Sequence, residues 1–359
     1  MNIALAHDWL TSCAGSEELL FCIHDQYPQA PIYTTIYNRS GVETNGRSSL
    51  RFNPKLIHTS WLQRIPGAKS HHQIMVPLMP WAIHWDLSKY DLVISDSSWV
   101  MKGIKAKKHI AIILTPTRWL WGFGGDNRAD NILAKPLKKI LRKWDLAAAQ
   151  KPDILIAISK TVQKRIKEIY HRDSVVIYPP VDVDRFKIAP ENEVQDYFLS
   201  VGRLVPYKKV DLLVEVFNQL GWPLKIIGSG PEEQKLKKKA KDNIEFLGAL
   251  SNEKRDWYYE HARAFVFPAD EDFGIVPVEA MAAGRPVIAY GQGGVSETVT
   301  EGLSGLFFHE QSAKSLIVAL KNFDKQKFNS ADIKKSVQKY NPNIFKSKVK
   351  NIVNSNLLV

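Results

Sequence analysis

Two glutamates stand eight positions apart in the segment DEDFGIVPVEA, and their setting is typical of a ligand site. Glu271 falls in a loop after the apolar run Ala264–Phe267, which predicts a strand, and Glu279 falls in the helix predicted to follow. Between them lies Gly274, where the backbone can approach a ligand closely. The N–H groups at the start of such a helix attract phosphate. Taken alone, the two glutamates are explained more simply by a solvated acidic loop that caps a helix.

Two cations nearby favour the ligand site. Arg203 and Lys208 lie in the loop after the predicted strand Tyr197–Val201, and therefore at the same carboxyl edge of the sheet as Glu271. Open α/β sheets bind ligands at that edge, and an arginine fork with a lysine point charge suits a diphosphate. A third loop, GSGPEE, begins at Gly228 and resembles half of a G-x-G-x-x-G turn. It is weak as a dinucleotide signature but consistent with a tight turn beside a ligand.

The elements that must position these residues are short apolar runs that alternate with helical stretches along the whole chain. The predicted strands are Ile3–Ala6, Leu92–Ser95, Ile110–Leu114, Ile154–Ile158, Val175–Tyr178, Tyr197–Val201, Leu224–Ile227, Ile244–Leu247, Ala264–Phe267, Val287–Ala289 and Gly305–Phe307. This alternation predicts parallel sheets covered by helices on both faces. It is interrupted at YPPV, residues 178–181, because two consecutive prolines cannot continue a helix or an inner strand. We therefore predict an α/β fold with two Rossmann-like domains facing each other across a cleft.

Composition narrows the function classes. The chain has 359 residues, which suits two domains, and its only cysteines are Cys13 and Cys22, too few for a disulfide framework or a cysteine-rich zinc site. We expect a cytoplasmic protein, because the amino terminus lacks the basic flank of a signal peptide and no apolar run approaches the ~20 residues that span a bilayer. Residues 1–180 hold 24 Lys and Arg against 14 Asp and Glu. That excess indicates nucleic acid, an anionic lipid surface or a phosphorylated ligand, but no nucleic-acid recognition motif is present, so we expect no nucleic-acid partner.

Four motifs in the second half occur in a recognisable order: VGRLVPYKKVDLLVEVF, IIGSGPEEQKLK, IEFLGALS and FPADEDFGIVPVEAMAAGRPVIAYGQGGVSETV. Together they resemble the retaining glycosyltransferases of family 4, which have the GT-B fold. The segments HDWLTSCAGSEELL and TPTRWLW resemble the first domain of the same family. The resemblance is greatest to bacterial enzymes that build surface polysaccharides, often mannosyltransferases. It implies a first domain of residues 1–179, to which a C-terminal helix at about 340–359 crosses back, and a nucleotide-sugar domain of residues 180–339.

The resemblance also implies a role for each candidate residue. Arg203 and Lys208 would hold the pyrophosphate of the donor and stabilise its leaving charge, and Glu271 would contact hydroxyls of the donor sugar; these three are the predicted catalytic residues. Glu279 would bind the ribose hydroxyls. Backbone atoms would meet the donor at a further set of positions. That set consists of Gly15, Gly228, Phe273, Gly274, Ile275 and Val276.

Two positions depart from the family pattern. Leu114 stands in Leu-Thr-Pro where family members usually carry histidine, and leucine can neither donate a hydrogen bond nor stabilise charge. His7, Thr115 or Arg118 is a candidate to compensate; otherwise turnover is weakened, and the chain is a partner subunit. The family's glycine pair is reduced to one glycine at Gly15. Neither departure touches the residues predicted to hold the diphosphate or the ribose.

The expected reaction is transfer of a hexose, mannose from GDP-mannose, to a lipid-linked or oligosaccharide acceptor in bacterial surface polysaccharide synthesis. A UDP-hexose such as UDP-glucose is the alternative donor. A related epimerase or phosphorylase is a rival from another class. No cofactor or metal is expected, because no DxD-like metal pair is evident beyond incidental acids. The segment 135–144 mixes cationic and apolar residues at helical spacing. Such a segment can lie on an anionic membrane surface, here the inner face of the cell membrane. The alternative is a solvated helix that packs by its apolar side.

Overall fold

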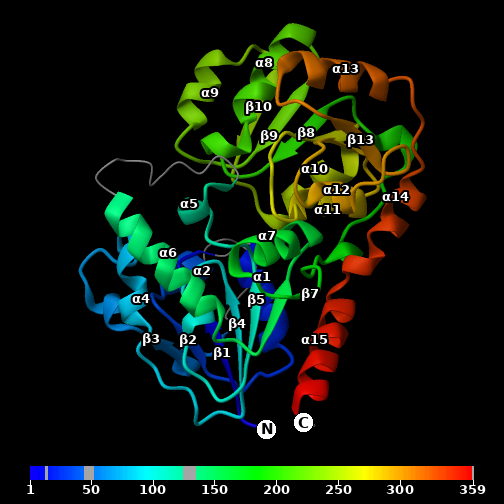
Figure 1. Cartoon of the computed structure of the whole chain (residues 1–359). Coiled ribbons are helices and arrows are strands. Elements are labelled where there is room, and N and C mark those ends of the chain that lie inside the picture. Colours follow the sequence, from blue (N-terminus) through cyan, green and yellow to red (C-terminus); the bar gives the residue numbers. More distant parts are fainter. Residues whose placement is uncertain (13–14, 44–51, 124–134, 358–359) are drawn as a thin grey trace. The chain divides into compact units, whose positions relative to one another are not determined.

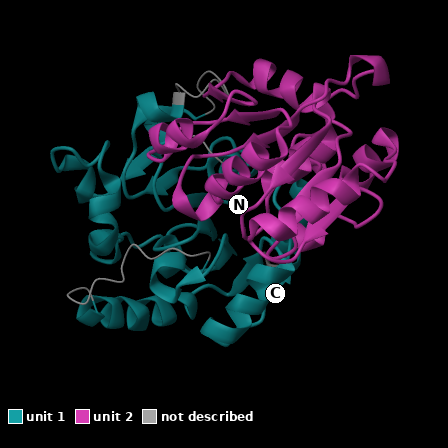
Figure 2. Cartoon of the chain, turned by 90° about the horizontal axis from the view of Figure 1, so that it is seen from above, with its two compact units in different colours: residues 1–180, 345–359 teal, residues 181–344 magenta. Residues whose placement is uncertain are grey.

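The structure, a computed structural model, describes residues 1–12, 15–43, 52–123 and 135–357 (Figure 1). The chain divides into two compact units, residues 1–180 with 345–359 and residues 181–344 (Figure 2). Each unit has its own parallel sheet, so each is a Rossmann-like domain. The predicted α/β fold class is confirmed.

The first unit is built on a seven-stranded sheet of order β3-β2-β1-β4-β5-β6-β7. The strands are β1 Ile3–His7, β2 Ile32–Thr34, β3 Ile57–Thr59, β4 Leu92–Ser97, β5 His109–Ile113, β6 Ile154–Ala157 and β7 Val175–Val176. Strand β1 is an inner strand, pairing with β2 on one side and with β4 on the other, so that His7 aligns with Asp96. All five residues of β1 are buried, as expected for an inner parallel strand covered on both faces.

The main helices of this unit are α1 Gly15–His24, α6 Lys135–Ala149, α7 Lys160–Tyr170 and α15 Pro342–Leu357. Helix α15 buries Val349 and Val353, and its Lys346 carbonyl accepts a hydrogen bond of 2.9 Å from Gln26. A series of short elements joins β2 to β4. They are α2 Arg39–Glu43, η1 Pro54–Leu56, η2 Trp61–Arg64, α3 His72–Met75, η3 Val76–Leu78 and α4 Met79–Ala82, followed after β4 by η4 Met101–Gly103 and α5 Arg118–Trp121.

The second unit is built on a six-stranded parallel sheet of order β10-β9-β8-β11-β12-β13. Its strands are β8 Phe198–Val201, β9 Leu224–Ile227, β10 Ile244–Gly248, β11 Ala264–Phe267, β12 Val287–Tyr290 and β13 Gly305–Phe308. Its helices and turns are η7 Val183–Arg185, η8 Glu191–Glu193, η9 Pro206–Lys208, α8 Val210–Leu220, α9 Glu233–Lys239, α10 Asn252–His261, α11 Ile275–Ala282, α12 Val295–Thr298, α13 Ala313–Phe323, α14 Ser330–Ser336 and η10 Gln338–Tyr340. Every strand predicted here is present, within about a residue at each end.

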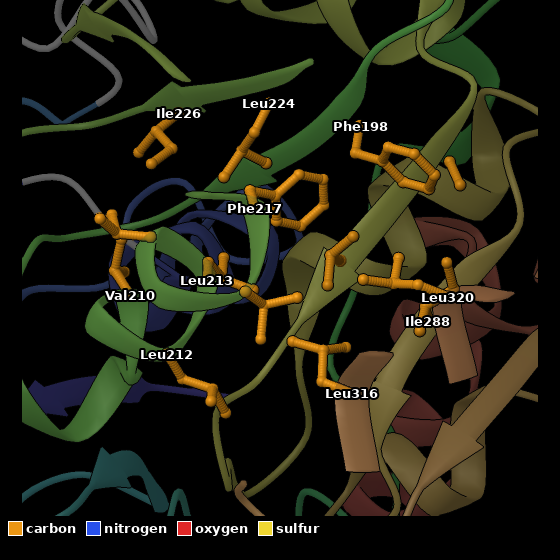
Figure 3. Packing of buried hydrophobic residues seen from close by; sticks show 14 of the residues in the cluster. Phe198, Val210, Leu212, Leu213, Phe217, Leu224, Ile226, Ile288, Leu316 and Leu320 are labelled. Atoms are coloured by element: carbon orange, nitrogen blue, oxygen red, sulfur yellow. The ribbon is translucent and has the colours of Figure 1, made fainter. Parts of the chain in front are cut away.

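The core of the second unit lies between the sheet and helices α8 and α13 (Figure 3). Phe198 from β8 meets Phe217 from α8 edge to face, with ring centroids 5.4 Å apart. Leu213 from α8 and Leu320 from α13 are both fully buried in the same cluster. Because this packing fixes α8 and α13 against the sheet, the loops at the carboxyl ends of the strands are held on a rigid base.

Candidate functional site

The strand order of the second sheet reverses between β8 and β11. The chain leaves β8 toward β9 on one side, and later strands are added on the other side, which opens a crevice at the carboxyl ends of these strands. A pocket lies at this point of the second unit. It is lined by Ser200, Val201, Gly202, Leu204, Lys208, Val210, Ile226, Phe267, Pro268 and Ala269. The sheet therefore places Lys208 where an open α/β sheet binds its ligand.

Lys208 and Glu271, which are 63 positions apart in the sequence, meet at this edge as an ion pair. Lys208 ends the single turn η9, and Glu271 lies in the loop after β11. The side chains are 18% and 16% exposed, so the pair is largely shielded from water but open on one side. Charges in such a setting interact more strongly than at a fully wet surface. The structure thus brings together two of the three predicted catalytic residues.

Arg203, the third, lies on the same loop as Lys208 but is exposed. Its guanidinium donates a hydrogen bond of 2.7 Å to the hydroxyl of Tyr207. The ammonium of Lys208 lies 5.7 Å from the centre of the same tyrosine ring. Tyr207 therefore stands between the two cations, in contact with each.

Close backbone contact explains why Gly228 begins the loop after β9. Its φ is +136°, and a Cβ built on it would lie 1.9 Å from the carbonyl oxygen of Gly202. No side chain fits there, so the loops after β8 and β9 touch through their main chains. The predicted tight turn at Gly228 is present.

A second glycine contact, which sequence reasoning missed, holds the loop of Glu271. The N–H of Gly294 donates a hydrogen bond of 2.7 Å to the carbonyl of Glu271, and a Cβ on Gly294 would lie 2.3 Å from the carbonyl of Asp272. The signal was available, because Gly293 and Gly294 follow the predicted strand Val287–Ala289 after three intervening residues. A glycine pair after a strand indicates close approach of another backbone.

The residues between the two glutamates form the start of α11. Phe273 is 3% exposed, and its ring packs edge to face against Tyr340, with centroids 5.3 Å apart. Gly274 immediately precedes the helix, and Ile275 and Val276 are its first residues. Because the side chain of Phe273 faces the core, this segment offers a ligand its main chain, and the N–H groups of a helix start attract anions.

Glu279 lies deeper, in a buried network of charges. One carboxylate oxygen is 2.9 Å from a guanidinium nitrogen of Arg185, and the other accepts a hydrogen bond of 3.1 Å from Tyr259. Arg185 also lies 3.0 Å from Asp256, and Arg255 lies 3.7 Å from Glu279. Glu279 is thus 2% exposed and already bound by protein groups, so its predicted role toward a ribose stays a prediction.

The first sheet has its own reversal of strand order, between β1 and β4, and a buried ionic cluster lies there. The ring of His7 is 2.7 Å from Asp96 through Nδ1 and 3.8 Å from Glu17 through Nε2. Burial alone would lower the pKa of His7, but the charges of Asp96 and Glu17 and hydrogen bonds to them raise it well above 6.5. The imidazole of His7 therefore lies between two acidic side chains, which favour its charged form.

Neighbouring residues make this edge rigid. The carboxylate of Asp8 accepts hydrogen bonds of 2.7 to 3.0 Å from four successive backbone N–H groups, at residues 98–101. Gly15 is the first residue of α1, while Cys13 and Ala14 lie outside the described residues. Leu114 follows β5 and is half-buried. Its aliphatic side chain has no polar group to replace the histidine expected there, and the compensating roles of His7, Thr115 and Arg118 stay predictions.

The charge of His7 makes a testable contribution to stability. Replacing His7 by glutamine is expected to destabilise the first unit by about 3 kcal/mol near neutral pH, because removing one partner of a buried ion pair leaves the other uncompensated. The groups that face it are Asp96 and Glu17, with Asp8 acting on Asp96. A group whose pKa is raised on folding contributes its full stabilisation at a pH below its unfolded pKa. This contribution is lost as the pH rises through its folded pKa. The loss should therefore shrink as the pH rises above about 7.5 toward the raised folded-state pKa of His7, measured by urea unfolding.

His109 is a matched control on strand β5, which pairs with β4 in the same sheet. It is buried and bonded to Ser95 at 2.8 Å, and burial lowers its pKa to about 3. It is neutral in the folded and the unfolded chain above about pH 7.5, so the loss caused by His109→Gln should not change with pH there. If the loss of unfolding free energy caused by His7→Gln is also independent of pH in this range, His7 is not charged in the folded protein.

Two features are absent from the described parts of the chain, a group of metal-binding side chains and a membrane-spanning helix. No group of three His, Cys, Asp or Glu side chains among those residues is arranged to hold a metal ion. None of the described helices combines the length and the apolar character needed to cross a membrane. The expectation that no metal is required stays a prediction.

Comparison with known proteins identifies the family. Residues 32–185 match the model of glycosyltransferase family 4, and residues 182–340 match the model of glycosyl transferases group 1. The two matches together span most of the chain. The protein belongs to glycosyltransferase family 4 and has the two Rossmann-like domains of the GT-B fold.

Two relatives and one solved structure add detail. The O-antigen chain mannosyltransferase RfbU of Salmonella typhimurium is 30% identical over 47% of this chain and 50% of that protein. A GDP-mannose-dependent phosphatidylinositol monomannoside mannosyltransferase of Mycobacterium tuberculosis is 29% identical over 43% of this chain and 48% of that protein. The chain thus spans about half the length of the curated relatives it matches. The structure of Anabaena HepE with UDP and glucose has a TM-score of 0.72 at 17% identity, covering 99% of this chain and 100% of that one, which shows the fold alone.

Proposed function

We propose that the protein is a retaining hexosyltransferase that moves mannose from GDP-mannose to a lipid-linked or oligosaccharide acceptor. The observation that carries this proposal is the ion pair of Lys208 and Glu271 at the strand-order reversal of the second sheet. A cation and a carboxylate held together there suit a donor that carries both a diphosphate and a sugar. The names of the two mannosyltransferase relatives support mannose, and the O-antigen relative supports a pathway of bacterial surface polysaccharide such as O-antigen, capsule or exopolysaccharide.

In this proposal each side chain either stabilises charge on the donor's diphosphate or positions the transferred sugar. Lys208 and Arg203 stabilise the negative charge that develops on the departing diphosphate, helped by the N–H groups at the start of α11. Glu271 accepts hydrogen bonds from hydroxyls of the transferred sugar. The acceptor hydroxyl attacks from the face that the diphosphate leaves and gives its proton to a phosphate oxygen, so configuration is retained. No metal takes part.

A second candidate is transfer from a UDP-hexose such as UDP-glucose. It is favoured by the similarity of fold to HepE, which binds UDP and glucose. The third alternative, a weakened partner subunit, rests on Leu114, which offers no polar group where the family usually has histidine.

We also propose that the protein works in the cytoplasm, associated peripherally with the inner face of the cell membrane. The support is the positive charge of the first half of the chain and the cationic helix α6. Juxtamembrane lysines and arginines are attracted to anionic lipid by about 1 kcal/mol each. A membrane surface is also where a lipid-linked acceptor is found.

Calorimetric titration of the protein with GDP, UDP, GDP-mannose and UDP-glucose tests the donor. Selective binding of GDP and GDP-mannose is expected, and selective binding of the uridine compounds would establish the second candidate instead. If none of the four binds, the partner-subunit alternative replaces both. The configuration of the product, read by NMR, tests retention.

A further inference from the structure

The helical segment formed by α3, η3 and α4, residues 72–82, is apolar on both of its faces. Its inner face packs into the core of the first unit through Met75, Val76, Met79 and Ala82. On its outer face Ile74 is 71% exposed, Leu78 is 43% exposed and Trp81 is 57% exposed. These three stand at i, i+4 and i+7, which is one side of a helix. A surface helix of a water-soluble protein normally turns polar residues outward.

A further exposed aromatic residue adjoins this face. Trp61, in η2, is 42% exposed, and η2 packs against α4. We call the exposed set of Trp61, Ile74, Leu78 and Trp81 the apolar ridge. Scattered single apolar residues on a surface need no explanation, but a contiguous group rimmed by polar residues marks an interaction surface.

The charged side chains within the segment that carries the ridge all have one sign. From Phe52 to Trp85 the sequence contains no Asp or Glu, while Lys55, Arg64 and Lys69 are exposed. Tryptophan is enriched where a protein meets the headgroup level of a bilayer, because its ring has an apolar body and a polar N–H. Cations next to an apolar helix face are typical of helices that lie on anionic lipid.

The ridge rests on a buried support that it shares with α6. The indole N–H of Trp99 donates a hydrogen bond of 2.9 Å to the carbonyl of Val76, and its ring packs against Trp144 of α6, with centroids 5.2 Å apart. Trp99 is 1% exposed, so it fixes both elements on the same core. A surface held in this way does not need to refold in order to bind.

We propose that the apolar ridge is the surface by which the protein docks on an anionic lipid bilayer. Trp61, Ile74, Leu78 and Trp81 enter the interface at headgroup depth, and Arg64 and Lys69 meet lipid phosphates. This rests on the proposed membrane association and assigns it to the ridge. A second copy of the chain fits the ridge less well, because a symmetric contact would bring the cations of both copies together.

Vesicle flotation of the whole 359-residue chain tests the ridge. The double variant Ile74→Gln/Trp81→Gln is expected to bind vesicles of phosphatidylcholine and phosphatidylglycerol roughly tenfold or more weakly than the parent, since two apolar side chains no longer leave water. The matched control is Val318→Gln/Trp257→Gln, which removes an exposed aliphatic and an exposed aromatic residue, 52% and 41% exposed, from the second unit. It is expected to bind like the parent. Pure phosphatidylcholine vesicles should bind the parent weakly.

Three results would overturn the proposal. The first is equal binding of the ridge variant and the parent. The second is loss of binding only in Leu137→Gln/Ile140→Gln, which would assign the membrane contact to α6. The third is loss of self-association in the ridge variant, measured by analytical ultracentrifugation, without loss of vesicle binding. A parent that binds a nucleotide sugar but no vesicle contradicts the ridge and leaves the proposed reaction standing; the opposite pattern contradicts the reaction and leaves the ridge.

Discussion

Replacing Lys208 by alanine is expected to weaken binding of the donor's nucleoside diphosphate by about tenfold to a hundredfold. A hydrogen bond between charged groups contributes about 1.5–3 kcal/mol, and each 1.4 kcal/mol is a factor of ten in affinity. Lys208 lines the pocket at the strand-order reversal, and its side chain is only 18% exposed. When its ammonium is removed, water therefore compensates little for the lost interaction with the diphosphate. The variant also leaves the carboxylate of Glu271 without its counterion, and that carboxylate then repels the diphosphate. Calorimetric titration with GDP and UDP measures the change.

The repulsion between Glu271 and the diphosphate can be separated from the direct loss of the Lys208 ammonium. In Lys208→Ala/Glu271→Gln the repelling charge is gone, so we expect this double variant to bind the diphosphate more tightly than Lys208→Ala alone. The control is Lys225→Ala, which breaks an ion pair with Glu245 that joins neighbouring strands of the same sheet outside the pocket. It should leave affinity unchanged. Equal affinity of the parent and Lys208→Ala would show that the donor does not bind in this pocket.

Replacing Arg185 by methionine is expected to destabilise the second unit by about 3 kcal/mol, the largest effect on stability predicted for that unit. Burial alone would lower the pKa of the Arg185 guanidinium, but Glu279 and Asp256 raise it, so the group stays charged within the network. Without it, both carboxylates remain largely buried and lose their best partner. For a unit of this size, about 3 kcal/mol corresponds to a fall in Tm of roughly 6–12 °C, read by differential scanning calorimetry.

Arg263 offers a matched control in the same unit. It also pairs with two carboxylates, Asp196 and Asp324, but these groups are between 33% and 78% exposed. Exposed pairs contribute about 0–1 kcal/mol, so Arg263→Met should lower the Tm by no more than a few degrees. If Arg185→Met and Arg263→Met have the same small effect, the network around Glu279 does not stabilise the unit.

Much of the second unit was predictable from sequence, because its strands are continuous apolar runs with loops of glycine and charge between them. Once the runs are accepted as parallel strands, Arg203, Lys208 and Glu271 must share one edge of the sheet. The partners of Glu279 were not predictable in this way. Arg185 and Tyr259 lie 94 and 20 positions away from it, and nothing local in the sequence pairs them.

The first unit was harder to predict for a related reason. Strands β2 and β3 have three residues each, too few for a periodic pattern. His7 and Asp96 meet only because β1 pairs with β4, 89 positions along the chain. The segment 72–82 was missed as well, since it consists of single turns with two prolines. Such turns are fixed by tertiary packing rather than by their own helical propensity.

In the Glu271 loop, the position of the main chain does not depend on the side chain at residue 271. Its main chain is fixed by Gly293 and Gly294, through a bridge and a hydrogen bond to the carbonyl of Glu271, and none of these contacts involves the glutamate side chain. A substitution at position 271 is therefore expected to change the side chain that pairs with Lys208 while the loop keeps its place. A substitution at position 294 displaces the loop whatever residue it carries. The side chain at position 271 is therefore open to redesign, and the glycine at position 294 is not.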